Sequence, residues 1–295
     1  MPDVAAIAAR HAAAQTALAR RTARELAALW SQVDPGRIGA SWRLLLPRAL
    51  AALAAAQHLA AGAADGYLNG ALSGGTALGR VRPEGFAGVA SDGRALVTLL
   101  QQPAITTLTQ IGRGVEPAGA LRMGGFTLDM ITRTQVADAG RVAVGTGIAA
   151  RPHAAGYVRL VGGKTCARCL ILAGRRYAWN AGFQRHPRCD CRHVPVAEDV
   201  PGDIMTNPRA HFDALTGAEQ DKLLGRAGAQ AVREGADLAR VVNARRGIQT
   251  AADGRLYTTE AAGRRPRLMP EQIYREAGAD RTEAVRLLRL HGYLT

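Results

Sequence analysis

Apolar residues recur at helical spacing through most of the first 144 residues. The expected helices cover residues 3–30, 38–72, 94–111 and 126–144. Asp34-Pro35-Gly36 is a turn sequence that ends the first helix, and Pro47 is expected to kink the second. The glycine-rich stretch 74–95 predicts irregular structure. The first 150 residues are therefore expected to form a helical domain.

The pattern changes near Arg151. Residues 156–161 alternate like a short strand, and residues 194–203 have the composition of a linker. Helical spacing then returns, with two capping-box sequences that begin at Thr216 and Asp280. The last helix is expected to cover residues 281–291, with Gly292 after its end.

All four cysteines fall between residues 166 and 191, as a Cys-x-x-Cys pair followed by a Cys-x-Cys pair. Clustered cysteines in a cytosolic protein indicate a metal site rather than a disulfide framework. A Cys-x-x-Cys turn brings two thiolates to one point, and residues i and i+2 of an extended segment share a face. The predicted ligands of a structural zinc ion are Cys166, Cys169, Cys189 and Cys191, with His186 and His193 as alternates. Buried free thiols and disulfides formed after release from the cell are the alternatives.

The predicted fold class is α+β and mainly α-helical. Three segments are expected: a helical N-terminal domain over 1–150, a small zinc-bound module with short strands over 151–196, and a linker with a helical C-terminal region over 197–295. Three aromatic residues between the cysteine pairs, Tyr177, Trp179 and Phe183, are expected to be core residues of the zinc-bound module.

The chain is strongly basic, with 38 lysines and arginines against 24 acidic residues and a net charge of +14. Such a balance indicates an anionic partner, for which nucleic acid is the usual candidate. Only two of the basic residues are lysines, so a GC-rich coding sequence is an alternative explanation of the arginine excess.

The arginines expected to contact double-stranded DNA without reading its sequence lie in two groups. They are Arg168, Arg175, Arg176, Arg185, Arg188 and Arg192 around the cysteines, and Arg245, Arg246, Arg264, Arg265 and Arg267 further on. The first group could equally pair with an acidic protein surface.

No secretion signal is recognisable at the start of the chain, which lacks a basic stretch followed by a strong apolar run. The most apolar stretch, residues 49–64, is mostly alanine and contains Gln57 and His58, so it is expected to be too weak for a membrane span. The sequence thus predicts a protein made in the cytoplasm, with no membrane partner.

Enzyme motifs are scarce. None of the four serines lies in a Gly-x-Ser-x-Gly sequence, and no His-Glu-x-x-His sequence occurs. A Ser91–His58–Asp65 trio can be written down for a peptidase, but no motif supports it. A nuclease would need oxygen ligands for a hard cation, and only Asp190 lies near the cysteines. No catalytic residue is assigned, and a structural role is favoured.

Three motifs around the cysteines carry a family resemblance: Cys166-x-x-Cys169-x-Ile171-Leu-Ala-Gly174, Trp179-Asn-Ala-Gly-Phe183 and Arg185-His-Pro-Arg-Cys-Asp-Cys-Arg-His193. They resemble the signature of MuF-like phage head-morphogenesis proteins, and most closely the forms in phages of actinobacteria. Further similar stretches lie at residues 85–93, 148–152, 241–247 and 283–292. The cysteine motifs are the most specific of these elements.

The resemblance implies a minor capsid protein of the virion, present in few copies and located inside the phage head or at its portal vertex. Its implied partners are the portal protein, the scaffold or major capsid protein, and packaged double-stranded DNA. Relatives of this kind are also described as capsid maturation proteases, so a peptidase acting in procapsid maturation is the alternative function.

Overall fold

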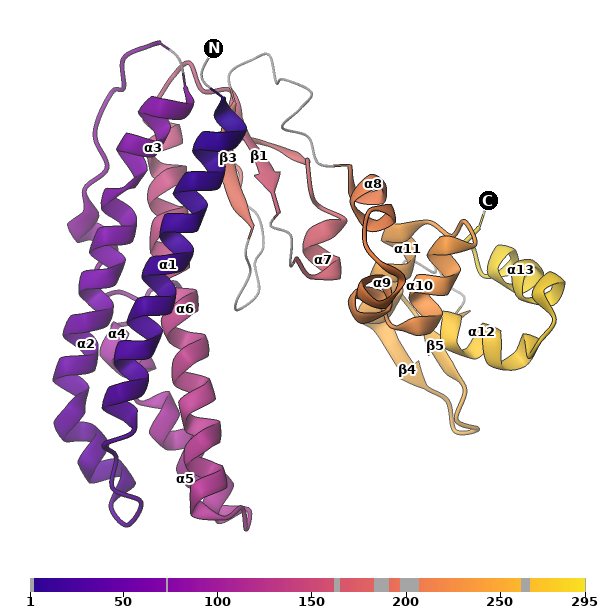
Figure 1. The fold of residues 1–295 in the computed structure, drawn as a ribbon, viewed down its shortest axis with the longest axis horizontal. Helices are drawn as coiled ribbons and strands as arrows, with labels where there is room; N and C mark the ends of the chain where they lie inside the picture. Colours follow the sequence, from indigo (N-terminus) through magenta and orange to yellow (C-terminus); the bar gives the residue numbers. More distant parts are fainter. Residues whose placement is uncertain are drawn as a thin grey trace. The chain divides into compact units, whose positions relative to one another are not determined.

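The computed structural model describes residues 3–72, 74–161, 165–182, 191–196, 207–260 and 266–294 (Figure 1). Helices account for 63% and strands for 9%, which confirms the predicted α+β, mainly helical class. The chain divides into two compact units. The N-terminal unit comprises Met1–Arg159 and Arg176–Ile204, and the C-terminal unit comprises Leu160–Arg175 and Met205–Thr295. Residues of the expected zinc-bound module, 151–196, therefore occur in both units.

Helices lying side by side build most of the N-terminal unit, and three of them are 25 residues or longer (Figure 1). They are α1 (Val4–Trp30), α2 (Ile38–Gly62), α3 (Ala64–Ala71), α4 (Leu96–Leu99), α5 (Gln102–Gly112) and α6 (Pro117–Ala149), with a 3-10 turn, η1, at Pro83–Phe86. The expected helices over 3–30 and 38–72 are confirmed. Trp30 and Trp42 meet edge to face at 5.0 Å in the core, and the Trp42 indole donates to the Leu100 carbonyl oxygen at 2.8 Å.

Helix α6 is 33 residues long and extends beyond the expected range of 126–144 at both ends. Its glycines lower the intrinsic helix propensity and weaken the apolar pattern. They allow close packing instead, because a Cβ at Gly124 would lie 2.2 Å from Thr107 Oγ1 and 2.6 Å from Trp30 Cζ2. Long-range packing therefore sets the length of α6.

The helical stretch Ile38–Ala71 is long and apolar enough to cross a membrane by length and composition alone. Its large side chains Trp42, Leu46 and Leu53 are buried in the core of the N-terminal unit. The expectation that residues 49–64 are too weakly apolar for a membrane span is therefore wrong for the helical stretch that contains them.

A three-stranded sheet completes the N-terminal unit, in the order β2 (Arg176–Ala178), β1 (Gly156–Leu160), β3 (Arg192–Val196). Strand β1 matches the expected strand. Its first residue must be glycine, because a Cβ there would lie 2.1 Å from the Tyr177 carbonyl oxygen of β2. The linker expected from residue 194 was placed too early, since Val194 and Val196 are buried residues of β3.

Short helices build the C-terminal unit around Leu170, Phe212, Met269, Ile273 and Leu288. They are α7 (Ala167–Leu170), α8 (Pro208–Asp213), α9 (Gly217–Leu224), α10 (Arg226–Arg233), α11 (Leu238–Ala244), α12 (Pro270–Ala277) and α13 (Arg281–Leu290), with a 3-10 turn, η3, at Arg245–Gly247. A second antiparallel sheet follows the order β4 (Ile248–Thr250), β5 (Leu256–Thr258), β6 (Arg267–Leu268). The expected helical C-terminal region thus also contains a small sheet, which was not among the expected elements.

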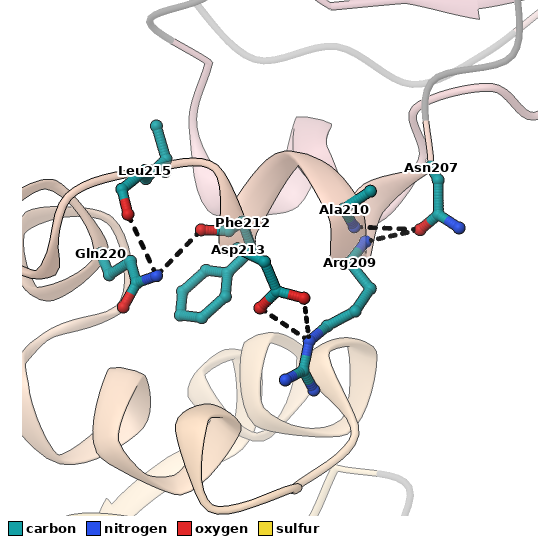
Figure 2. Close-up of polar contacts among 7 residues, drawn as sticks. All are labelled: Asn207, Arg209, Ala210, Phe212, Asp213, Leu215 and Gln220. Carbon is teal, nitrogen blue, oxygen red and sulfur yellow. Dashed lines mark hydrogen bonds and ion pairs between the residues drawn. The ribbon is translucent and has the colours of Figure 1, made fainter.

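Polar caps begin several of these helices. Thr216 and Glu219 form the predicted capping box of α9, with both reciprocal hydrogen bonds present. The capping box predicted at the start of α13 is only half formed. The Asp280 side chain accepts from the Glu283 N–H, but the Glu283 carboxylate pairs with Arg286 at 2.7 Å. Figure 2 shows the start of α8, where the Asn207 side chain accepts from two backbone N–H groups. The same figure shows Gln220 of α9, which donates to carbonyl oxygens of the preceding segment at 3.0 and 3.2 Å.

Candidate functional site

Cys166 and Cys169 form a local turn in the C-terminal unit. Cys166 is the N-cap of α7, and its sulfur accepts a hydrogen bond from the Cys169 backbone N–H at 3.4 Å. Cys169 is only 1% exposed, and the next residue, Leu170, is buried in the core of the unit. The core therefore anchors the turn, and the backbone hydrogen bond suits a sulfur that carries negative charge.

Cys191 lies in the N-terminal unit and is completely buried. The buried guanidinium of Arg159 donates to its sulfur at 3.2 Å, and Arg141 donates to its carbonyl oxygen at 2.8 Å. A guanidinium donor beside the sulfur is compatible with a thiolate, which is the form of cysteine that binds metal. No local pattern indicates this arrangement, because Arg159 and Cys191 are 32 residues apart.

Cys166, Cys169 and Cys191 form no disulfide with one another. In the part of the chain that the structure describes, no three His, Cys, Asp or Glu side chains gather as a metal site. Two predicted ligands, Cys189 and His186, lie outside the described residues. The zinc site thus remains a prediction, supported locally by the turn at Cys166.

The alternate ligand His193 belongs to β3, where its ring lies 4.3 Å from that of Tyr157 and its carbonyl oxygen accepts from the Tyr67 hydroxyl at 2.9 Å. It borders a surface groove of about 330 Å³ together with Val142 of α6 and Trp179. Trp179 is 51% exposed, so its expected role as a core residue is wrong. Tyr177 is half-buried and stacks on Tyr157, while Phe183 lies outside the described residues.

The arginines expected to contact DNA differ in their surroundings. Arg168, Arg175 and Arg176 are exposed, and Arg192 is half-buried. Arg185, Arg188, Arg264 and Arg265 lie outside the described residues. The structure therefore leaves three of the first group on the protein surface.

In the second group, two arginines pair with carboxylates: Arg245 lies 2.7 Å from Glu271 and Arg246 lies 3.8 Å from Glu260. Arg267 is only 9% exposed, and its guanidinium donates to the Glu260 carbonyl oxygen at 2.7 Å and lies over the Tyr293 ring. A buried guanidinium with these internal contacts is not placed to bind a phosphate. Sequence reasoning took Arg267 for a surface residue because its partner Tyr293 lies 26 positions away.

Ser91, His58 and Asp65, the trio considered for a peptidase, each contact a residue outside the trio. Ser91 Oγ accepts from the Gln135 amide at 3.0 Å, His58 lies 3.6 Å from Glu84, and Asp65 pairs with Arg151 at 3.1 Å. A serine nucleophile needs its base within hydrogen-bond reach. The described contacts of Ser91 and His58 do not supply that arrangement.

A family model described as VG15 protein matches residues 1–215. This range covers the whole N-terminal unit and all four cysteines. No curated protein and no solved structure matches the chain.

Proposed function

Because the chain belongs to the VG15 protein family, a family of phage-encoded viral proteins, we propose that it is a minor capsid protein of the MuF-like, head-morphogenesis type. The observation that carries the proposal is the family match over residues 1–215, which includes the cysteine motifs. The strongly basic composition supports a place beside packaged DNA, since a net charge of +14 favours an anionic partner.

In this proposal the protein occupies the interior of the head or its portal vertex and contacts the portal protein and the scaffold or major capsid protein. The helical N-terminal unit provides the surface for these partners. Its exposed apolar side chains include Leu44, Ile105, Leu108 and Phe126. In the proposal these side chains contribute to the assembly contacts.

A structural zinc ion is part of the proposal, held by Cys166, Cys169, Cys189 and Cys191, with His186 and His193 as alternates. The turn at Cys166 and the guanidinium beside the Cys191 sulfur both fit thiolate ligands. Zinc bound by four thiolates has no open position for substrate, so its role is to hold the chain rather than to catalyse a reaction.

Co-expression tests the proposal. The chain is produced with its own portal, scaffold and major capsid proteins, and procapsids are separated by sedimentation. We expect it to sediment with particles that contain portal, in few copies per particle. Failure to enter particles, with or without portal, would contradict the proposal.

The same particles test the alternative function. A maturation protease would shorten the major capsid protein, and mass spectrometry of its N-terminus would detect the cut. Cleavage that depends on this chain and is lost in the Ser91→Ala or His58→Ala variant would replace the structural proposal by a peptidase. We expect no dependence on either residue.

A further inference from the structure

One face of α13 carries three arginines. Ala284, Leu287 and Leu288 point into the core of the C-terminal unit. With 3.6 residues per turn, Arg281, Arg289 and Arg286 fall within an arc of about 140° that contains none of these buried residues. Together with Thr282 and Val285 they line a shallow surface groove of about 520 Å³. The helix thus presents a basic face, defined by these five residues.

The exposed arginines of the C-terminal unit differ in whether a carboxylate lies beside them. Outside α13, several have carboxylate partners: Arg209 with Asp213 (Figure 2), Arg233 with Asp221, Arg245 with Glu271 and Arg255 with Asp253. Others have no ion pair among the residues that the structure describes, as at Arg226, Arg240 and Arg275. On the basic face Arg286 pairs with Glu283. Arg281 and Arg289 have no carboxylate within ion-pair distance among the residues that the structure describes. Two guanidinium groups on one helix face are therefore available to an external anion.

The spacing and chemistry of the face point to a phosphate backbone. Arg281 and Arg289 are eight residues apart, which is about 12 Å along a helix. That length of B-form DNA presents roughly three or four phosphates of one strand. Guanidinium groups bind phosphate oxygens in a fork geometry, and the Thr282 hydroxyl adds a donor. The face has no aromatic side chain on which a base could stack.

We propose that the basic face of α13 binds the phosphate backbone of double-stranded DNA without reading its sequence. The proposal rests on the proposed function only for the source of the DNA, the packaged genome. It adds a site outside residues 1–215, the range of the family match, and outside the arginines that the sequence singled out. The face acts within the C-terminal unit, because all its residues belong to α13.

Titration of the purified full-length protein with a labelled 30-base-pair duplex over a range of salt concentrations tests the proposal. Each phosphate contact contributes about one to the slope of log affinity against log salt. The Arg281→Gln/Arg289→Gln variant should therefore bind more weakly, with a slope smaller by about two. Both side chains are exposed, so we expect the variant to keep the melting temperature of the wild type.

Arg209→Gln/Arg255→Gln is the matched control, because it removes the same charge from exposed arginines that have carboxylate partners. It should retain more of the affinity and slope. Equal losses in the two variants would show that only net charge matters and would overturn the site, as would unchanged binding in the α13 variant. Poly-glutamate is a suitable competitor. If it displaces the duplex when its carboxylates are as concentrated as the phosphates of the duplex, the face would be assigned to an acidic protein instead. Head assembly is measured separately, so failure of this proposal leaves the proposed function standing.

Discussion

The two units of the molecule are ordered by different means. In the N-terminal unit, long helices approach closely where side chains are absent, as at Gly124 beside Trp30. In the C-terminal unit no helix exceeds ten residues among those that the structure describes, and many of them depend on polar side chains at their ends. Close packing is sensitive to added volume, whereas a capped helix loses a single hydrogen bond when its cap is removed. The two units should therefore respond differently to substitution.

Loss of zinc is the largest expected effect. Purified protein should hold one zinc ion per chain, and Cys169→Ser should expose the chain around α7 to protease far more than helices α1 and α6. Zinc contributes about 10–16 kcal/mol in small peptides, where metal binding and folding are coupled, so its loss should be severe in the cysteine segment. Elemental analysis and limited proteolysis provide the measurements.

Ala167→Ser is the control for this substitution, because it adds a hydroxyl to the same turn without removing a thiol. Wild-type protein that carries no metal and has four titratable thiols would refute the zinc site. Equal protection of the cysteine segment in Cys169→Ser and wild type would show that metal does not hold it.

The second largest effect is expected at Gly124. Its substitution by valine would place atoms against Thr107, Trp30 and the Pro103 carbonyl oxygen, all within 3.0 Å of the added Cβ. We expect a loss of about 3 kcal/mol or more in unfolding free energy. The melting temperature of the N-terminal unit should fall by roughly 6–12 °C.

Gly66→Ala provides the comparison for Gly124→Val. Gly66 also lies in a helix of the N-terminal unit, but nothing lies within 4 Å of the Cβ position. Alanine should stabilise this helix by about 0.5–1 kcal/mol because of its higher helix propensity. Similar melting temperatures for the two variants would contradict the close-packing account.

The two glycines show why part of the fold escapes prediction. Capping boxes are readable because their partners are three residues apart, and the Thr216 box was found in this way. The contacts of Gly124 join residues from three helices, so they could not be read from local spacing, and the expected helix began only at residue 126. A local signal at Asp253-Gly254 was overlooked: this dipeptide is typical of hairpin turns, and it connects β4 to β5.

In the candidate site, too, some features follow from local spacing and others depend on long-range contacts. The Cys166–Cys169 turn follows from local spacing, and the structure contains it. The position of Arg159 beside Cys191 depends on strand pairing and could not be read from the sequence. The same holds for Arg267, which the fold buries although its residue type favours the surface.

The pH dependence of stability should differ between the units because of His11. Burial and the nearby Arg192 lower the pKa of His11 to about 4 from its usual 6.5. The unfolded chain therefore binds an extra proton between these values, so stability is complete above about pH 6.5 and falls toward pH 4. The expected loss of unfolding free energy is about 3 kcal/mol, because the pKa of His11 differs by roughly 2.5 between the unfolded and the folded chain.

His11→Phe should keep the stacking contact with Tyr67, whose ring lies 4.1 Å away, and remove this acid sensitivity. Thermal melts of wild type and variant between pH 4 and pH 7 measure the difference. Parallel pH profiles for the two proteins would rule out His11 as the cause.

The smallest expected effect concerns the cap of α9. Thr216→Ala removes the side-chain acceptor for the Glu219 N–H and should cost about 1 kcal/mol of unfolding free energy in the C-terminal unit. Thr282→Ala, at an exposed position of α13 that caps no helix, should change stability by less than about 0.5 kcal/mol. Denaturant titration of both variants measures the difference. Equal losses of unfolding free energy in the two variants would show that the Thr216 cap does not stabilise α9.

The central claim is that this phage-encoded chain is a component of the head. Quantitative mass spectrometry of purified mature heads tests it most directly, with the portal protein as an internal reference for copy number. The account predicts peptides from both units at a copy number similar to that of the portal protein and far below that of the major capsid protein. Heads that contain no peptide of the chain, although infected cells produce it, would contradict the claim.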